Sequence, residues 1–213
     1  MYGWTGKILH IDLTRRRFEI ETPGVDFYAR HTGGKGLGGH YLRPCATLAW
    51  DNPEMVVGLF TGPLVATTAP TSGRAHMVSK SPLTGLVGDA SVGGKLATRL
   101  KRAGWDGLVI TGRSDAPVGV EIHDDRVVFQ NASHLRGQDT EAVHRALNPR
   151  KAALACIGPA AENGVRFASV TTDRHHSAGR CGLGLSMAAK GLKYILVDGS
   201  GRCCSRRLQP CWP

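Results

Sequence analysis

A polar, basic segment in the middle of the chain has the composition of a ligand-binding wall. Residues 69–85 read APTSGRAHMVSKSPLTG, mostly Ser, Thr, Gly and Pro, with Arg74 and Lys80 among the basic side chains. The segment is too small and polar to form core, so we expect it at the surface. An Arg fork can hold a phosphate or an amide edge through paired hydrogen bonds. The segment therefore predicts one wall of a cradle for an anionic cofactor.

Two glycine-rich turns that precede helix-like stretches supply backbone groups for the same purpose. Gly93-Gly94 precedes a helical pattern that Asp89 or Ser91 could cap, and the second turn lies at 182–184. A helix start has unpaired N–H groups and the positive end of the helix dipole, and both favour phosphate. We expect two such junctions to hold two anionic groups. Further cations come from Lys95, His175, His176 and Arg180.

The same residues admit simpler interpretations. Arg74, Lys80 and Lys95 could be solvated surface cations, and the glycines could only form turns. Adjacent histidines point apart on a strand, so His175 and His176 rarely chelate one ion. We find no Ser-His-Asp set, Walker loop or carboxylate pair, and we assign no catalytic residue. Residue types and spacing indicate a phosphorylated ligand at duplicated helix starts and nothing more specific.

A formal dinucleotide fingerprint is also present. The motif is Gly34-x-Gly36-x-x-Gly39. Such a motif should follow a buried strand, open a helix and precede an acidic residue on a second strand by about twenty positions. The preceding FYARHT is not a buried strand, and Asp51 lies in a turn with Pro53. The sequence therefore disfavours a Rossmann site.

Composition bounds the class of protein. The chain has 213 residues, is 41% hydrophobic and carries a formal net charge of +10, which favours an anionic partner. It lacks an apolar run of the roughly 18 residues that cross a bilayer, and its start lacks the pattern of a signal peptide. Cys45, Cys156 and Cys181 stand alone, which indicates a reducing cytoplasm and small buried residues. We predict a cytoplasmic protein without a membrane segment.

The order of expected elements repeats once. Alternating apolar and polar residues predict hairpins at 7–21 and 118–130, and apolar runs predict strands at 55–63 and 152–160. A glycine-rich turn, a helix and a closing strand follow at 91–112 and again at 181–199. We predict an α+β fold made of a duplicated unit, with two mostly antiparallel β-sheets and short helices. Chance resemblance among short apolar runs is the alternative.

The predicted boundaries follow from this repeat. One domain spans 1–199, and its similar halves are about 1–112 and 113–199. The last segment, 200–213, has no periodicity, and Cys203, Cys204 and Cys211 lack the paired short spacings of a structural zinc site. We predict a disordered or frameshifted tail there.

Several motifs along the chain resemble one known family. GWTGKILHIDLT, TGGKGLGG, APTSGR, SKSPLTG, RAGWDGLVITG, IGPAAENGVRFASV and HSAGRCGLG occur in family order across residues 2–199. Together they resemble the N-terminal domain of the aldehyde ferredoxin oxidoreductases. The resemblance implies two similar α+β units that cradle a tungsten, sometimes molybdenum, bis-pterin cofactor, with a magnesium ion joining its phosphates.

The resemblance also implies roles for single residues. Arg74, Gly93, His176 and Gly179 match positions that contact the pterin, and we expect Arg180 to add a cation beside them. The family often has Arg where His176 stands, so charge pairing there depends on pH. Magnesium ligation through backbone carbonyls is expected from Ser91 and Ser177, since a carbonyl ligand requires backbone shape rather than a particular side chain.

Family enzymes continue for several hundred residues beyond this domain. The resemblance implies that the missing part holds a [4Fe-4S] cluster and the acid–base residues, so this chain is catalytically incomplete. The full-length enzyme oxidises an aldehyde to a carboxylic acid and passes electrons to ferredoxin. One alternative is a cofactor-binding subunit that works with a separately encoded C-terminal partner. A homodimer is left open as a further kind of assembly. Another alternative is a basic nucleic-acid-binding protein, which the lack of aromatics interleaved with cations in 69–95 disfavours.

Overall fold

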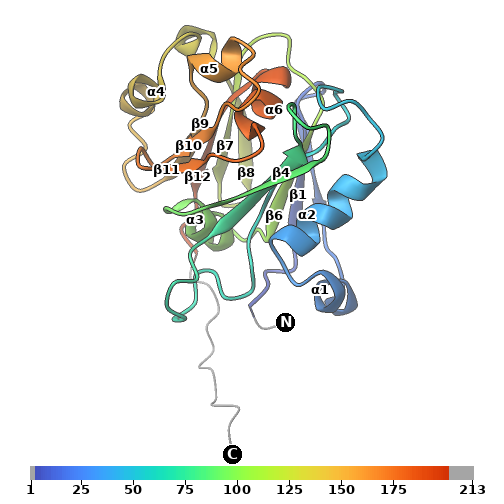
Figure 1. Cartoon of the computed structure of the whole chain (residues 1–213). Coiled ribbons are helices and arrows are strands. Elements are labelled where there is room, and N and C mark those ends of the chain that lie inside the picture. Colours follow the sequence, from blue (N-terminus) through green and yellow to red (C-terminus); the bar gives the residue numbers. More distant parts are fainter. Residues whose placement is uncertain (1–2, 202–213) are drawn as a thin grey trace, which may run out of the picture.

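The computed structural model describes residues 3–201, which form two six-stranded sheets with short helices (Figure 1). The first sheet has the order β2-β1-β6-β3-β4-β5 and the second the order β11-β10-β9-β12-β7-β8. The strands of the first sheet are β1 (Ile8–Asp12), β2 (Arg17–Glu21), β3 (Val57–Phe60), β4 (Ala75–Lys80), β5 (Val87–Val92) and β6 (Gly107–Thr111). Those of the second are β7 (Val118–His123), β8 (Arg126–Asn131), β9 (Ala153–Cys156), β10 (Val170–Thr172), β11 (His176–Ala178) and β12 (Leu192–Asp198).

The two sheets have equivalent connections. Replacing each strand of the first sheet by the strand six places later in the chain gives β8-β7-β12-β9-β10-β11. This is the order of the second sheet read from its other edge. In each sheet only the first and last strands pair in parallel, β1 with β6 and β7 with β12, and every other pair is antiparallel. The predicted fold class, with hairpins at 7–21 and 118–130, is confirmed. The boundaries at 112 and 199 stay a prediction, and residues 202–213 of the expected tail lie outside the described part.

Helices connect and cover the sheets. The helices are α1 (Val25–His31), α2 (Lys35–Leu42), α3 (Leu96–Arg102), α4 (Thr140–Leu147), α5 (Pro159–Glu162) and α6 (Leu183–Ala189), with single turns η1 (Arg43–Cys45) and η2 (Ser133–Leu135). The largest core cluster contains residues of both sheets and of α3 and α6. A second cluster lies between the first sheet and α1 and α2, and a third between the second sheet and α4. Apolar side chains on both faces of each sheet are thereby removed from water.

The crossover helices lie against the opposite half. Helix α3 leads from β5 to β6 of the first sheet but packs on β9 and β12 of the second. Helix α6 leads from β11 to β12 yet packs on β4 and β5 as well as on β12. Each half therefore completes the core of the other, and the two sheets form one folding unit.

The segment 69–85 differs from our expectation in part. It contains β4, in which Ala75, Met77, Val78 and Ser79 are buried. Its side chains alternate between two faces that both carry packed layers, so small residues and one Met fill core positions. The prediction that the whole segment is too polar for core was wrong, whereas Arg74 at its centre is exposed.

A buried ion pair fixes the start of the chain. The Lys101 ammonium at the end of α3 contacts the Asp106 carboxylate before β6, and both side chains have no exposed surface. Asp106 also accepts hydrogen bonds from the backbone N–H groups of Thr5 and Gly6, at 3.0 and 2.8 Å. Lys101 Nζ donates to the Gly3 carbonyl at 3.0 Å. These contacts satisfy both buried charges, as a dry environment requires.

We therefore expect Asp106→Ala to lower the free energy of unfolding by about 3–5 kcal/mol, because it leaves the Lys101 ammonium buried without its partner. Urea denaturation measures the change. The control is Asp198→Ala, whose carboxylate is half exposed and lies 3.8 Å from Arg99 Nη1; it should cost less than about 1 kcal/mol. Equal effects of the two substitutions would contradict this account of the pair.

Candidate functional site

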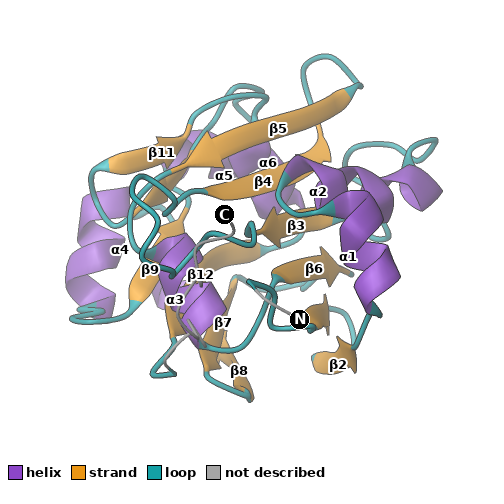
Figure 2. Cartoon of the chain, turned by 90° about the horizontal axis from the view of Figure 1, so that it is seen from below, coloured by secondary structure: helices purple, strands orange, loops and turns teal. Residues whose placement is uncertain are grey.

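The outer strands β5 and β11 of the two sheets lie side by side (Figure 2). A Cβ atom placed on Gly88 would lie 2.6 Å from the Cβ of Cys181, and one placed on Gly93 would lie 3.3 Å from His176 Nδ1. The Cys181 thiol also donates to the Asp89 carbonyl at 3.6 Å. Because position 88 meets 181 and position 93 meets 176, the two segments run in opposite directions. The two halves thus meet along one antiparallel line.

The residues that the sequence assigned to the cofactor lie on this line or next to it. Ser91 is in β5, His176 and Ser177 are in β11, and Gly93 and Gly179 directly follow these strands. Arg74 precedes β4, whose His76 pairs with Ser91, and Arg74 Nη1 lies 3.4 Å from Ser91 Oγ. Among these residues Arg74, His176, Ser177, Gly179 and Arg180 are exposed. The structure therefore brings the predicted set together, and the role of each residue stays a prediction.

The start of α3 differs from our expectation. Lys95 N donates to Asp173 Oδ2 at 2.6 Å, so the acceptor comes from the other half of the chain rather than from Asp89 or Ser91. Gly94 has φ +87, and a Cβ there would lie 2.6 Å from the same oxygen. Glycine at this position allows the turn to approach the carboxylate.

At the start of α6, too, one backbone N–H group already has an acceptor within the protein. Gly182, in the left-handed conformation with φ +70, is the N-cap, and Gly184 N donates to the Ala168 carbonyl at 2.9 Å. The expectation of unpaired amides at both junctions is therefore wrong for Lys95 and Gly184. The first N–H groups of a helix have no acceptor within the helix, so acceptors from other parts of the chain can pair with them. The Lys95 and Gly184 amides are therefore not available to an anion.

A second polar cluster adjoins the line, and sequence reasoning missed it. Asp89 accepts from Lys35 Nζ at 3.0 Å, and His76 Nδ1 lies 3.8 Å from the same carboxylate. Burial lowers the pKa of His76, although Asp89 opposes the shift, and this favours the neutral imidazole. Lys35 belongs to the glycine-rich motif that we compared with a dinucleotide fingerprint. Its nearness to β5 depends on the packing of α2 on β4, which no local spacing reveals.

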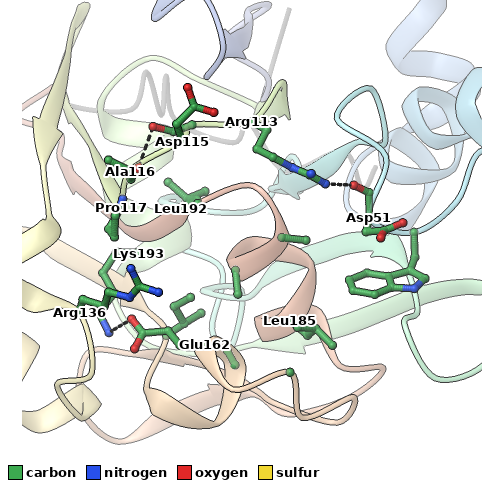
Figure 3. A pocket seen from close by; sticks show the side chains of 18 residues that line it. Asp51, Arg113, Asp115, Ala116, Pro117, Arg136, Glu162, Leu185, Leu192 and Lys193 are labelled. Carbon is green, nitrogen blue, oxygen red and sulfur yellow. Dashed lines mark hydrogen bonds and ion pairs between the residues drawn. The ribbon is translucent and has the colours of Figure 1, made fainter.

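A cavity of about 440 Å³ lies elsewhere, between the segment 113–117, α5 and α6 (Figure 3). Two of its charged side chains have partners within the protein: Lys193 Nζ lies 2.7 Å from Glu162 Oε1, and Arg113 donates to the Asp51 backbone carbonyl. None of the residues assigned to the cofactor lines this cavity. We therefore place the candidate site at the β5–β11 line rather than here.

Two general properties of the described residues complete the account of the site. No group of three or more His, Cys, Asp or Glu side chains within residues 3–201 is arranged to hold a metal ion. In the same range, no helix has both the length and the apolar character to traverse a lipid bilayer. The expected magnesium ligands are backbone carbonyls, so the first result leaves that prediction as it stands.

Comparison with known proteins agrees with this fold. The model of the aldehyde ferredoxin oxidoreductase N-terminal domain matches residues 8–199. The chain belongs to the aldehyde ferredoxin oxidoreductase family. Tungsten-containing aldehyde ferredoxin oxidoreductases of Pyrococcus abyssi and Thermococcus kodakarensis are each 40% identical over 95% of this chain and 34% of their own length.

More distant members share the domain. The WOR-like subunit of an aliphatic sulfonate oxidoreductase from Pyrococcus furiosus is 32% identical over 94% of this chain and 35% of its own length. The solved active-site complex BamBC of benzoyl coenzyme A reductase, in complex with 1,5-dienoyl-CoA, superposes with a TM-score of 0.90. It is 33% identical over 95% of this chain and 32% of that one. The chain thus spans about a third of the length of the relatives that it matches.

The contact of Gly88 with Cys181 gives a test of the antiparallel line. We expect Gly88→Ala to lower the free energy of unfolding by about 1–3 kcal/mol, because the new methyl group would overlap the Cβ of Cys181. Cys181→Gly in the same chain should restore stability, since it removes the clashing atom and relieves a φ of +64. Urea unfolding of both single variants and the double variant measures the coupling. Strictly additive effects would show that the two positions do not touch.

Proposed function

We propose that the chain is the domain that binds a tungsten, or molybdenum, bis-pterin cofactor in an aldehyde ferredoxin oxidoreductase. One observation carries the proposal: β5 and β11 approach each other, with glycine turns and exposed cationic side chains along their line of contact. The names of the Pyrococcus abyssi and Thermococcus kodakarensis relatives, which are tungsten-containing aldehyde ferredoxin oxidoreductases, support the same assignment.

The residues at this line fit an anionic ligand. Arg74, His176 and Arg180 are exposed, and two of them come from the second half while Arg74 comes from the first. Guanidinium groups bind phosphate through paired, charge-assisted hydrogen bonds, and glycine turns let the backbone approach a bulky ligand closely. In this arrangement Arg74, Arg180 and His176 would hold the pterin phosphates, and Gly93 and Gly179 would leave space beside the rings. The Ser91 and Ser177 carbonyls would face magnesium.

The cofactor would supply two-electron redox chemistry at its metal. This chain would bind and orient the cofactor, and we assign it no catalytic residue. Aldehyde oxidation, a [4Fe-4S] cluster and electron transfer to ferredoxin belong in our proposal to the further two thirds that the relatives possess. The free thiols of Cys45 and Cys156, both buried, accord with a cytoplasmic location, which we propose on that ground.

Arg74 provides the test. We expect Arg74→Ala to reduce tungsten per mole of folded protein about tenfold or more when the gene is expressed with tungstate, because a charge-assisted hydrogen bond to the cofactor is lost. The free energy of unfolding should change by less than about 0.5 kcal/mol, since the side chain is exposed. Elemental analysis and urea denaturation measure the two effects. The control is Arg126→Ala, an exposed residue of β8 at the far edge of the second sheet.

Unchanged tungsten content in Arg74→Ala, together with a large loss of stability, would show that Arg74 is structural. Absence of both tungsten and molybdenum from the unaltered chain would contradict the proposed function itself.

A second candidate is a cofactor-binding subunit completed by a separate polypeptide. The turn between β4 and β5 exposes Leu83, Leu86 and Val87, with 70% of Leu86 accessible, and Phe167 is 75% accessible. Gly182 lies between these two segments: a Cβ placed there would lie 3.4 Å from Pro82 Cδ and 1.9 Å from the Arg166 carbonyl oxygen. Exposed apolar side chains gathered at one place indicate an interface. The occupant we propose is the polypeptide equivalent to the remaining two thirds of the relatives.

We expect this chain to copurify with the C-terminal two thirds of the Thermococcus kodakarensis relative when the two are coexpressed. Leu86→Glu should abolish copurification, because it places a charge in an apolar contact. The matched control is Val25→Glu, since Val25 is 56% accessible and lies at the start of α1. Failure to copurify, or equal retention by Leu86→Glu, would rule out this surface as the interface.

A further inference from the structure

Asp173 joins the two halves at the candidate site. It follows β10 and has φ +47, a conformation uncommon for a residue other than glycine. Asp173 N donates to the Leu154 carbonyl at 3.0 Å, and Asp173 Oδ1 accepts from Leu154 N at 3.2 Å. Asp173 thus extends the pairing of β9 with β10 by one residue beyond Thr172. Its backbone N–H makes one of the two bonds to Leu154, and its side chain accepts the other.

The other carboxylate oxygen reaches across to the first half. Asp173 Oδ2 accepts from Lys95 N at 2.6 Å, next to the Gly93-Gly94 turn. The preceding residue makes a parallel contact, as Thr172 Oγ1 donates to the Gly93 carbonyl at 3.4 Å. Both oxygens of Asp173 are therefore committed to backbone N–H groups, one from each half. Such charge-assisted bonds are roughly twice as strong as neutral ones.

The turn that Asp173 holds is the one that meets His176. Both positions 93 and 94 lie against this imidazole: a Cβ on Gly94 would lie 3.0 Å from His176 Cδ2, and one on Gly93 would lie 3.3 Å from Nδ1. We propose that Asp173 is a positioning residue that fixes the Gly93-Gly94 turn against His176, so that the binding groups of the two halves keep one spacing. The consequence for cofactor retention rests on the proposed function.

The charged groups around Asp173 do not substitute for it. Arg174 Nε lies 3.0 Å from His144 Nδ1 and 3.5 Å from Glu141 Oε2, so this neighbouring cation is held by α4. The Lys95 side chain is exposed, and only its backbone N–H contacts the carboxylate. If the carboxylate were lost, only the bond of Thr172 Oγ1 to the Gly93 carbonyl, among the hydrogen bonds of residues 3–201, would still hold the turn to the second half. A displacement of 1 Å in a site of this kind is enough to weaken binding strongly.

The test uses Asp173→Asn, which keeps the size of the side chain and tolerates the left-handed backbone. An amide has only one acceptor oxygen, so it cannot serve both Lys95 N and Leu154 N. The matched control is Asp139→Asn, because Asp139 Oδ1 also accepts a backbone bond at a helix start, from Ala142 N at 2.7 Å, and α4 contributes none of the predicted cofactor-binding residues. Asp139→Asn keeps an oxygen for its one bond and should lose little stability, whereas Asp173→Asn loses one of its two bonds.

In the chain without cofactor, we expect the Lys95 or Leu154 amide of Asp173→Asn to exchange with solvent about tenfold faster. The NMR signals of the His176 ring should also shift, whereas Asp139→Asn should leave all three unchanged. An unshifted His176 ring would overturn the inference whether or not the proposed function holds.

In tungstate-supplemented expression, we expect Asp173→Asn to lose about tenfold in tungsten per folded chain while Asp139→Asn keeps its content. Equal tungsten in the two variants would overturn the positioning role in cofactor retention. Tungsten and molybdenum missing from the unaltered chain would instead refute the proposed function, and the His176 result would still decide the contact between the halves.

Discussion

The close approach of β5 to β11 is the constraint on which the rest of the structure depends. At Gly88 and Gly94 even one methyl group would lie 2.6 Å from an atom of the other half. Without this approach α6 could not contact β5. The central core would then lose the interlocking that lets two small sheets behave as one unit, because apolar surface has to be buried against a partner to stabilise a fold.

Duplication explains how such a line of contact arises. Two units with the same strand order present the same outer strand, and a pseudo-twofold arrangement sets these strands antiparallel. Each unit then supplies one side of the site, and neither contains the whole set of predicted binding residues. Arg74, Ser91 and Gly93 come from the first unit, and His176, Ser177 and Gly179 from the second. A ligand with two similar anionic ends suits a site built in this way.

Much of the fold could be predicted from the sequence, because strong local patterns carry it. The alternation around 7–21 and 118–130 marked two hairpins, and the repeated order of elements marked the duplication. Strand β4 was missed because buried small residues look polar in composition. The caps of α3 and α6 were missed for another reason. Lys95 N pairs with Asp173 and Gly184 N with Ala168, and such partners are chosen by tertiary packing. The family resemblance selected the site residues, whereas spacing alone could not show that Gly93 faces His176.

Two carboxylates, Asp89 and Asp173, lie beside the line where we propose that an anionic ligand binds. Asp89 is paired with the Lys35 ammonium, whereas Asp173 keeps its negative charge and is stabilised by two backbone N–H donors. Arg74 and Arg180 are exposed beside this line, within a chain whose formal net charge of +10 favours an anionic partner. Carboxylates that are fully engaged with N–H donors and ammonium groups stabilise backbone geometry without repelling a phosphate strongly. Asp173 can therefore hold the Gly93-Gly94 turn while the exposed arginines stay available to the ligand that we propose.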